Sequence, residues 1–414
     1  MTRRDIEIMA PVGSYESLRA AIAAGADSVY FGVGELNMRS RSAANFTLDD
    51  IARIVSIARE AEVKTYLTLN TVIYDNELTV MRAIADRAAA EGVDAVIASD
   101  QAAIAHCRSL GIGVHISTQL NISNLETVRF YSAFADVMVL ARELSLEQTE
   151  AIHRGVVTEN ICGPRGELIK IELFVHGALC MSVSGKCYLS LHECGESANR
   201  GACRQICRRS YLLTDKETGY GINTEGEYLL SPKDLCTIDF LDNVIGAGVS
   251  VLKIEGRARS AEYVKRVVEC YSQALEAIFE GCYDEALRKE LKNSLGEVFN
   301  RGFWEGYYLG RPAVELSMNY GSSASKRKVY VGKLTNFYGN ISVAEVAVEA
   351  TPLDKGDEIV VIGETTGVVE FTPEDIFVDE VPAETAPQGR RCSIKSPSKL
   401  HRGDKLYKLV DLFE

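Results

Sequence analysis

The sequence contains no apolar run long enough to cross a membrane, so we expect no membrane partner. Its first residues, Met1 to Asp5, lack the apolar region of a signal peptide, and we therefore expect a cytoplasmic protein. No His-Glu-x-x-His motif is present, because His192-Glu193-Cys194-Gly195-Glu196 lacks the second histidine. No Gly-x-Ser-x-Gly motif is present either. These two absences argue against a zincin-type metalloprotease and against a hydrolase of the nucleophile-elbow type.

The chain also lacks an excess of positive charge. It carries 45 basic and 58 acidic residues, which gives a formal net charge of −13. This balance argues against a protein that coats nucleic acid along its whole surface. It leaves room for a local basic site, and Arg200, Arg204, Arg208 and Arg209 surround two of the clustered cysteines described below.

The first 280 residues alternate short apolar segments with amphipathic helical patterns. Eight such units favour a TIM-like (β/α)8 barrel, an α/β fold, over a doubly wound open sheet. About 75 residues separate the last two predicted strands, and we expect an insertion at about 177–249, at the end of the barrel where active sites lie. The predicted strands are Ile6–Met9, Ser28–Phe31, Lys64–Leu69, Ala95–Ser99, Val114–Ser117, Val137–Leu140, Ile171–Val175 and Ser250–Ile254.

The sequence changes character twice after residue 280. Residues 281–325 predict a connector with helical and aromatic segments. Residues 326–414 contain short β segments separated by turns, which predicts a small C-terminal β-barrel domain. A chain of 414 residues is long enough for two or three such units.

Cysteine is abundant for a protein expected in a reducing compartment, where clustered cysteines indicate metal binding or catalysis before disulfides. The chain has 11 cysteines, and five of them fall within the 28 residues from Cys180 to Cys207. The spacing Cys180-x6-Cys187-x15-Cys203-x3-Cys207 is wider than the knuckles of structural zinc sites, except at the last pair. Four thiolates could hold zinc or a [4Fe–4S] cluster, and the wide spacing favours the cluster. A set of reduced core cysteines is the third alternative.

Two further cysteines bear on the choice of ligands. Cys194 lies in a polar segment after His192-Glu193, and we interpret it as a bystander. Cys236, in Ser231-Pro232-Lys233-Asp234-Leu235-Cys236, could replace one of the four expected ligands.

Several motifs are similar to those of one known family. Glu172-Leu173-Phe174-Val175-His176-Gly177-Ala178-Leu179-Cys180, continuing to Gly185-Lys186-Cys187, is similar to the signature of the U32 (collagenase-like peptidase) family. Four further segments are also similar to U32 motifs. They are Ala198-Asn199-Arg200-Gly201-Ala202-Cys203, Lys253-Ile254-Glu255-Gly256-Arg257, His115-Ile116-Ser117-Thr118-Gln119-Leu120-Asn121 and Ala10-Pro11-Val12-Gly13-Ser14. The resemblance covers nearly the whole chain.

The resemblance implies one of several activities. Some members of the family are oxygen-independent hydroxylases with a [4Fe–4S] cluster, and form 5-hydroxyuridine at the wobble position of tRNA with prephenate as the implied hydroxyl donor. Others hydroxylate a cytidine in ribosomal RNA or act in ubiquinone synthesis, and some work as pairs with a family-member partner subunit. The family name itself implies a peptidase. The two-domain layout resembles the tRNA-type members most. The segment Ser197-Ala198-Asn199-Arg200-Gly201 also resembles the ribosomal-RNA type, which leaves the RNA substrate open.

The resemblance also implies roles for individual residues. A dianionic donor such as prephenate needs guanidinium partners, and Arg257 and Arg259 follow the eighth strand while Arg39 and Arg41 follow the second. Lys253 and Glu255, in the same motif as Arg257, are further candidates for the donor site.

Four residues are candidates for catalysis. His115 and Gln119 could bind the donor or the base, and structural hydrogen bonds are the alternative for both. His176 and Glu172 could move protons or order the cysteine loop, and a buried ion pair with Lys253 or Arg257 is the alternative for Glu172. Tyr188 or Tyr211 could stack on a single-stranded RNA base.

Overall fold

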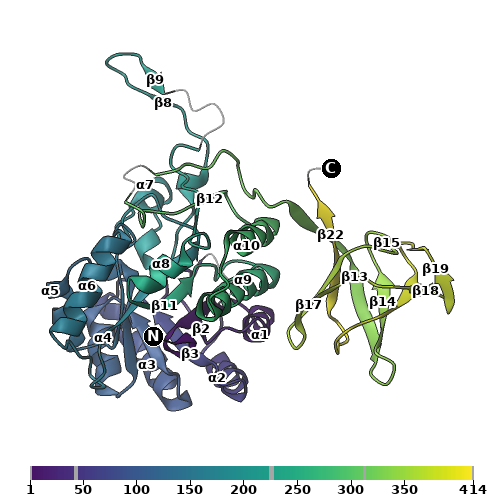
Figure 1. Cartoon of the computed structure of the whole chain (residues 1–414), viewed down its shortest axis with the longest axis horizontal. Coiled ribbons are helices and arrows are strands. Elements are labelled where there is room, and N and C mark those ends of the chain that lie inside the picture. Colours follow the sequence, from purple (N-terminus) through teal and green to yellow (C-terminus); the bar gives the residue numbers. More distant parts are fainter. Residues whose placement is uncertain (1, 42–44, 223–227, 311–313, 413–414) are drawn as a thin grey trace.

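The N-terminal part of the computed structural model is a closed (β/α)8 barrel, which confirms the predicted fold class (Figure 1). The structure describes residues 2–41, 45–222, 228–310 and 314–412, so that short parts of the predicted insertion and connector lie outside it. Pairing of the last barrel strand with both the first and the seventh closes the ring. The barrel strands are β1 (Glu7–Pro11), β2 (Ser28–Gly32), β3 (Lys64–Leu69), β4 (Ala95–Ala98), β5 (Gly113–Ile116), β6 (Val137–Val139), β7 (Lys170–Gly177) and β11 (Val249–Ile254).

A helix follows every barrel strand and covers its outer face. Apolar side chains on both sides of the strands explain why the strands read as continuous hydrophobic runs. The covering helices are α1 (Tyr15–Ala23), α2 (Asp50–Glu60), α3 (Leu78–Glu91), α4 (Gln101–Ser109), α5 (Leu125–Ser132), α6 (Leu146–Thr158), α8 (Leu241–Gly246) and α9 (Ala261–Glu280). No helix among these or elsewhere in the described ranges combines the length and apolar character that a membrane crossing requires.

The insertion between β7 and α8 lies over the C-terminal end of the barrel. It contains the short helix α7 (Leu189–Cys194) and a hairpin of β8 (Leu213–Thr214) and β9 (Gly221–Ile222), which projects away from the barrel in Figure 1. The strand β10 (Asp234–Cys236) then pairs antiparallel with β7, and β12 (Phe303–Trp304) pairs with β10 after the helix α10 (Glu285–Glu297). The hydrophobic periodicity of the sequence predicted neither β10 nor its antiparallel pairing with β7.

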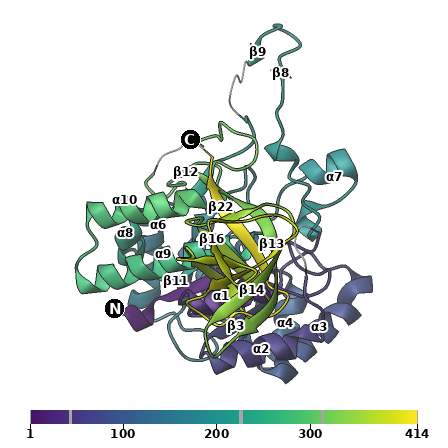
Figure 2. The ribbon, with the colours of Figure 1, turned by 90° about the vertical axis from the view of Figure 1, so that its right-hand side faces the viewer.

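The C-terminal part is an antiparallel eight-stranded sheet with an apolar core of its own (Figure 2). Its strands are β13 (Lys326–Tyr338), β14 (Val343–Val348), β16 (Ile359–Gly363), β17 (Gly367–Phe371), β18 (Ile376–Val378), β19 (Val381–Ala383), β21 (Arg391–Lys395) and β22 (Lys405–Asp411), and β15 (Leu353–Asp354) and β20 (Thr385–Ala386) form a separate pair. Figure 1 shows this part beside α1 and α9. It therefore lies against the barrel wall and not over the barrel mouth.

The contact between the two parts is apolar at its centre and ionic at its edge. Val360 and Val368 of the sheet pack against Ala20 and Ala261 of the helices. Gly367 has φ +74° and lies so close to α1 that an added Cβ would be 2.9 Å from the Cβ of Arg19. A larger residue at position 367 would therefore separate the two surfaces.

Glu370 is the ionic centre of this contact, and we expect Glu370→Gln to weaken it. Its carboxylate is 3.2 Å from the Lys265 ammonium and 3.2 Å from the Arg266 guanidinium, and all three side chains are largely buried. Loss of hydrogen bonds to charged groups should lower the free energy of unfolding by roughly 1.5–3 kcal/mol, measured by urea denaturation. Glu364→Gln is the control, because Glu364 forms an exposed pair with Arg53 and should change stability by less than about 0.5 kcal/mol. Equal effects of the two substitutions would contradict the prediction.

Candidate functional site

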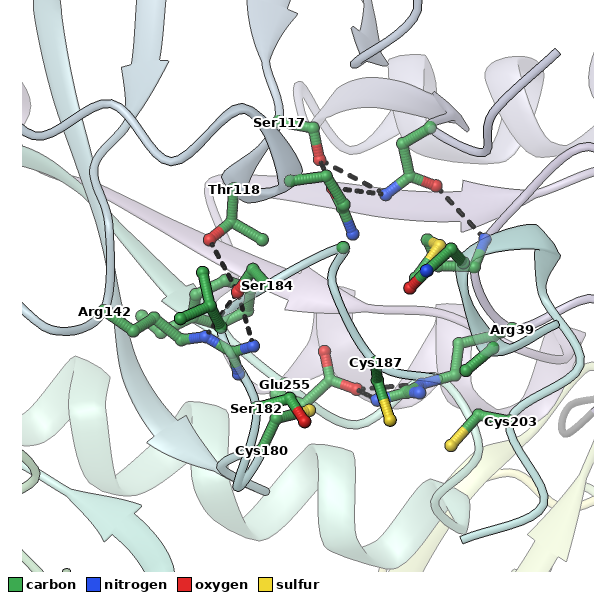
Figure 3. A pocket seen from close by; sticks show the side chains of 18 of the residues that line it. Arg39, Ser117, Thr118, Arg142, Cys180, Ser182, Ser184, Cys187, Cys203 and Glu255 are labelled. Atoms are coloured by element: carbon green, nitrogen blue, oxygen red, sulfur yellow. Dashed lines mark hydrogen bonds and ion pairs between the residues drawn. The ribbon is translucent and has the colours of Figure 1, made fainter. Parts of the chain in front are cut away.

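A cavity of about 160 Å³ lies at the C-terminal ends of the barrel strands, beneath the insertion. Four cysteines line it, namely Cys180, Cys187, Cys203 and Cys207. Figure 3 shows three of them, Cys180, Cys187 and Cys203, near the Arg39–Glu255 pair. The structure thus brings the four expected ligands to one cavity, although they come from separate turns of the insertion.

The protein surroundings of two of these thiols differ in charge. Desolvation raises the pKa of Cys180, but the guanidinium groups of Arg142 and Arg39 outweigh this effect and lower the pKa below its usual value. Burial raises the pKa of Cys207, and Arg208 opposes this only in part. Of these two thiols, Cys180 is therefore the one whose surroundings favour the thiolate, which is the form that binds metals.

The other two cysteines considered lie outside the cavity. Cys194 ends α7 and is exposed. Cys236 is buried in β10 opposite His176, and burial raises its pKa to about 12. The structure therefore does not support Cys236 as a substitute ligand, because its thiol is buried in the apolar core.

Three basic side chains predicted for the donor site line the cavity. Arg39 binds Glu255 through Nε at 3.1 Å and Nη2 at 2.5 Å. Burial raises the pKa of Glu255, but Arg39 lowers it further, so this carboxyl is held ionised. Arg257 is buried and donates to the Thr68 hydroxyl at 2.8 Å, and Lys253 completes the set. Burial lowers the pKa of Arg257 to about 10, which still leaves it charged at neutral pH.

Arg142 is a fourth cation in the cavity, and the sequence reasoning missed it. Its Nε and Nη2 atoms donate to the Ser184 hydroxyl at 3.1 and 2.7 Å, so it is held by the loop that connects Cys180 and Cys187. Its position just after β6 was the available signal, because residues at that end of a barrel strand face the mouth. Among the described residues, no carboxylate lies within ion-pair distance of Arg142 or Arg257. Two guanidinium groups are therefore available to an anionic ligand.

Amide and hydroxyl groups form the opposite wall, as Figure 3 shows. Gln119 follows β5 and accepts a hydrogen bond from Ser117. Asn70 donates to Ser117 at 3.3 Å and to Gln119 at 3.4 Å. Gly185 lies so close that an added Cβ would be 3.0 Å from the Gln119 Cβ. Gln119 thus borders the cavity and also supports the cysteine loop.

Glu172, Lys253 and His115 form a charged group inside the barrel. Glu172 is fully buried, and its Oε1 accepts a hydrogen bond from Lys253 Nζ at 2.5 Å. Its Oε2 lies 3.4 Å from His115 Nδ1. The alternative of a buried ion pair between Glu172 and Lys253 is therefore confirmed. His115 lies below the cavity and does not line it, in contrast to Gln119.

His176 is a predicted site residue that does not lie at the cavity. His176 packs against Tyr263, Tyr271 and Phe303 on the outside of the barrel, because a bulge in β7 after Phe174 turns it away from the interior. Burial lowers the pKa of His176 to about 3, so it is neutral.

Arg259 and Arg41 also lie elsewhere. The guanidinium of Arg259 stacks on Phe299 at 3.6 Å and does not line the cavity with Arg257. Arg41 is exposed and lies 3.9 Å from Glu35 at the surface. After β2, Arg39 lines the cavity and Arg41 does not. After β11, Arg257 lines it and Arg259 does not.

The arginines of the insertion serve mainly to hold it in place. Arg200 pairs with Glu77 at 2.5 Å, and Arg204 pairs with Glu196 at 2.5 Å. Arg208 donates to the backbone carbonyls of Leu179 and Pro232 at 2.6 Å each. These three arginines are therefore weaker candidates for the expected local basic site than the sequence alone indicated.

The two candidate stacking residues are placed differently. Tyr188 is 68% exposed beside Cys187 and is free to stack on a ligand. The hydroxyl of Tyr211 donates to the Ile206 carbonyl at 2.7 Å, so that ring is tied to the insertion. Tyr188 is thus the better candidate for contact with a base.

These features define a (β/α)8-barrel protein whose mouth carries a cavity lined by thiols and guanidinium groups. Residues 13–318 match the model of peptidase family U32, and the chain belongs to this family. It is 54% identical over 408 residues to a collagenase of Porphyromonas gingivalis, with 99% of each chain covered. It is 31% identical to the tRNA hydroxylation protein P1 of Bacillus subtilis, covering 90% of this chain and 87% of that protein. It is also 34% identical to the 23S rRNA 5-hydroxycytidine C2501 synthase of Escherichia coli, covering 92% of this chain and 57% of the synthase.

Proposed function

We propose that this chain is an RNA hydroxylase that forms 5-hydroxyuridine at the wobble position of tRNA, with a prephenate-like dicarboxylate as hydroxyl donor. The observation that carries the proposal is the mouth cavity, in which four thiols face two guanidinium groups without carboxylate partners. Relatives named for hydroxylation of tRNA and of 23S rRNA support the reaction class. The alignment covers 87% of the tRNA hydroxylation protein but only 57% of the rRNA synthase. This closer agreement in length favours tRNA as the substrate.

The donor set fits a [4Fe–4S] cluster better than a single zinc ion. Cys180, Cys187, Cys203 and Cys207 would be its ligands, since four thiolates around one cavity are the usual set for such a cluster. In the part of the chain that the structure describes, no three His, Cys, Asp or Glu side chains lie close enough together to hold a single metal ion. A bound cluster supplies redox or Lewis-acid chemistry beside the substrate.

The residues of the chain supply binding and orientation. Arg142 and Arg257 pair with the carboxylates of the donor, because a guanidinium binds a carboxylate in a fixed, bidentate geometry. The Arg39–Glu255 pair sets the position of one wall, and Gln119 and Asn70 offer amide groups to the donor or to the base. Tyr188 at the rim offers an aromatic face on which the nucleobase stacks.

Nucleoside mass spectrometry of tRNA and rRNA from a deletion strain tests this proposal. The 5-hydroxyuridine of tRNA should disappear, and a plasmid that carries the wild-type chain should restore it. Loss of a hydroxylated cytidine from rRNA with unchanged tRNA would redirect the proposal to the ribosome. Unchanged nucleosides in both RNAs would overturn it. Restoration only when a second family member is also supplied would identify a partner subunit.

A peptidase is the second candidate, and the name of the P. gingivalis relative is the observation that favours it. Among the described residues, the cavity contains no histidine that could activate a cysteine, since His176 and His115 both lie outside it. Incubation of the anaerobically purified protein with collagen and with mixed peptides, followed by mass spectrometry, decides between the two. Cleavage that survives Cys180→Ala while RNA modification is absent would favour the peptidase.

Arg142→Gln is expected to weaken binding of the dicarboxylate donor. Loss of a charged hydrogen-bonding partner costs about 1.5–3 kcal/mol, which corresponds to a roughly 10- to 100-fold higher Kd. Isothermal titration of the purified protein with prephenate measures the change. Arg41→Gln is the matched control, because this exposed arginine follows the same strand as Arg39 but does not reach the cavity. An unchanged Kd for Arg142→Gln would remove Arg142 from the donor site.

A further inference from the structure

The side-chain amide of Gln119 is held in one orientation by a chain of hydrogen bonds that starts at a backbone N–H. The Met38 N–H donates to Asn70 Oδ1 at 3.2 Å. The Asn70 amino group therefore faces the other way and donates to Ser117 Oγ at 3.3 Å and to Gln119 Oε1 at 3.4 Å. The Ser117 hydroxyl donates to the same Oε1. A reversed Gln119 amide would set its amino group against that of Asn70, so Nε2 is the atom left free.

The surrounding structure keeps the Gln119 side chain in place. Asn70 and Ser117 are 8% and 2% exposed, so their hydrogen bonds are shielded from water. Gly185, with φ +71°, packs on the Gln119 side chain, because an added Cβ would be 3.0 Å from the Gln119 Cβ and 3.1 Å from its Cγ. Gln119 lines the mouth cavity, and its Nε2 makes no hydrogen bond to the part of the chain that the structure describes. The cavity wall thus presents a fixed N–H donor at this point.

The cysteine loop contacts both this amide and the guanidinium of Arg142. Arg142 donates to the Ser184 hydroxyl from Nε and Nη2, as Figure 3 shows, which leaves its Nη1 free. Ser184 directly precedes Gly185, the residue that packs on Gln119. Asn121 Nδ2 joins the same two segments, since it donates to the Ser184 carbonyl at 3.0 Å and to the Gln119 carbonyl at 2.8 Å. A guanidinium and an amide N–H are therefore fixed relative to each other by adjacent residues of one loop.

We propose that Arg142 and Gln119 together recognise a 2-oxocarboxylate group, and that Gln119 selects a 2-oxo acid over its 2-amino counterpart. The carboxylate pairs with the Arg142 guanidinium, and the neighbouring keto oxygen accepts a hydrogen bond from Gln119 Nε2. An ammonium group in place of the keto oxygen would set a donor against a donor, and the guanidinium groups of Arg142 and Arg257 would repel it. No covalent bond changes in this recognition step.

The inference rests on the proposed function, because the prephenate-like donor carries such a group. Prephenate has two carboxylates, and one of them belongs to a pyruvyl side chain with a keto oxygen on the next carbon. Arg142 and Gln119 hold the pyruvyl group, which leaves the second carboxylate for Arg257. The cavity thereby distinguishes the two ends of its donor.

Isothermal titration of the anaerobically purified full chain with prephenate and with arogenate, its 2-amino counterpart, tests this selection. The wild-type protein should bind prephenate at least about 100-fold more tightly. Gln119→Met keeps the length of the side chain but removes the donor, so it should raise the Kd for prephenate about 10-fold and leave that for arogenate unchanged. Gln148→Met is the matched control, because Gln148 is exposed in the first turn of α6 and does not line the cavity. The wild-type ratio of the two Kd values in Gln119→Met would overturn the inference.

Asn70→Asp tests the hydrogen-bond chain without changing Gln119. The new carboxylate still accepts from the Met38 N–H but cannot donate to Gln119 Oε1, so the Gln119 amide should turn and present its oxygen to the cavity. The 2-hydroxy counterpart of prephenate has the same charge as prephenate and can donate to that oxygen. Asn70→Asp should therefore shift the preference from the 2-oxo to the 2-hydroxy acid by about 10-fold. Equal weakening of both acids would show a purely structural role of Asn70 and would contradict the inference.

Failure of the proposed function would give a different result. Absence of prephenate binding by the wild-type protein would remove the proposed donor, and titration with 2-oxoglutarate and with glutamate then decides the inference. These two dicarboxylates differ in the same group as prephenate and arogenate do. Tighter binding of 2-oxoglutarate that Gln119→Met abolishes would support the inference. Equal or absent binding of the two by the wild-type protein would overturn it.

Discussion

Alanine in place of Cys180, Cys187, Cys203 or Cys207 is expected to remove the iron from anaerobically purified protein and to abolish RNA hydroxylation in cells. All four thiols line one cavity, and a cluster that loses one of four thiolates loses a bond that no neighbouring side chain replaces. The loss of rate should exceed about 1000-fold, because the reaction would lack the proposed cluster. Iron analysis, the visible absorption of the thiolate-to-iron bands and nucleoside mass spectrometry measure the three consequences.

Two cysteines of the same region provide matched controls. Cys194→Ala should keep iron and activity, since Cys194 is exposed at the end of α7 and away from the cavity. Cys236→Ala should also keep iron, although loss of a buried side chain lowers its stability somewhat. Iron loss in Cys236→Ala with retention in Cys207→Ala would show that the ligand set is wrong. Colourless wild-type protein with one zinc per chain would show that the cluster assignment is wrong.

The fold was largely predictable, because buried parallel strands leave a strong signal in sequence. The segment Ser28–Phe31 lies between Asp27 and Gly32 and contains only residues that the structure buries, and it became β2 almost unchanged. The strand β10 was missed because three residues, Asp234–Cys236, are too short for any periodicity.

The site was predictable only in part, because sequence spacing does not tell which way a side chain points. Strict alternation along β7 places Glu172, Phe174 and His176 on one face, but the bulge after Phe174 turns His176 outward. Arg142 was missed for a different reason. It does not lie within a motif, and its position after the short strand β6 is a weaker signal than its contact with Ser184 of the cysteine loop.

Lys253→Met is expected to destabilise the barrel by about 3–5 kcal/mol, because it leaves the Glu172 carboxylate buried without its partner. Urea denaturation of the full chain measures the loss. The double variant Glu172→Leu, Lys253→Met should recover most of it, since apolar residues of similar volume replace a buried ion pair at little cost. A loss below about 1 kcal/mol for Lys253→Met would contradict the prediction, because the pair would then contribute no more than an exposed one.

The stability that the Glu172–Lys253 pair contributes should also depend on pH. Burial raises the pKa of Glu172, but Lys253 and His115 lower it further, so that it lies below the usual value of 4.5 in the folded protein. The contribution of the pair to stability is therefore complete above pH 4.5 and is lost as the pH falls through the lower, folded pKa. The wild-type protein should lose this increment in acid, and the double variant should not.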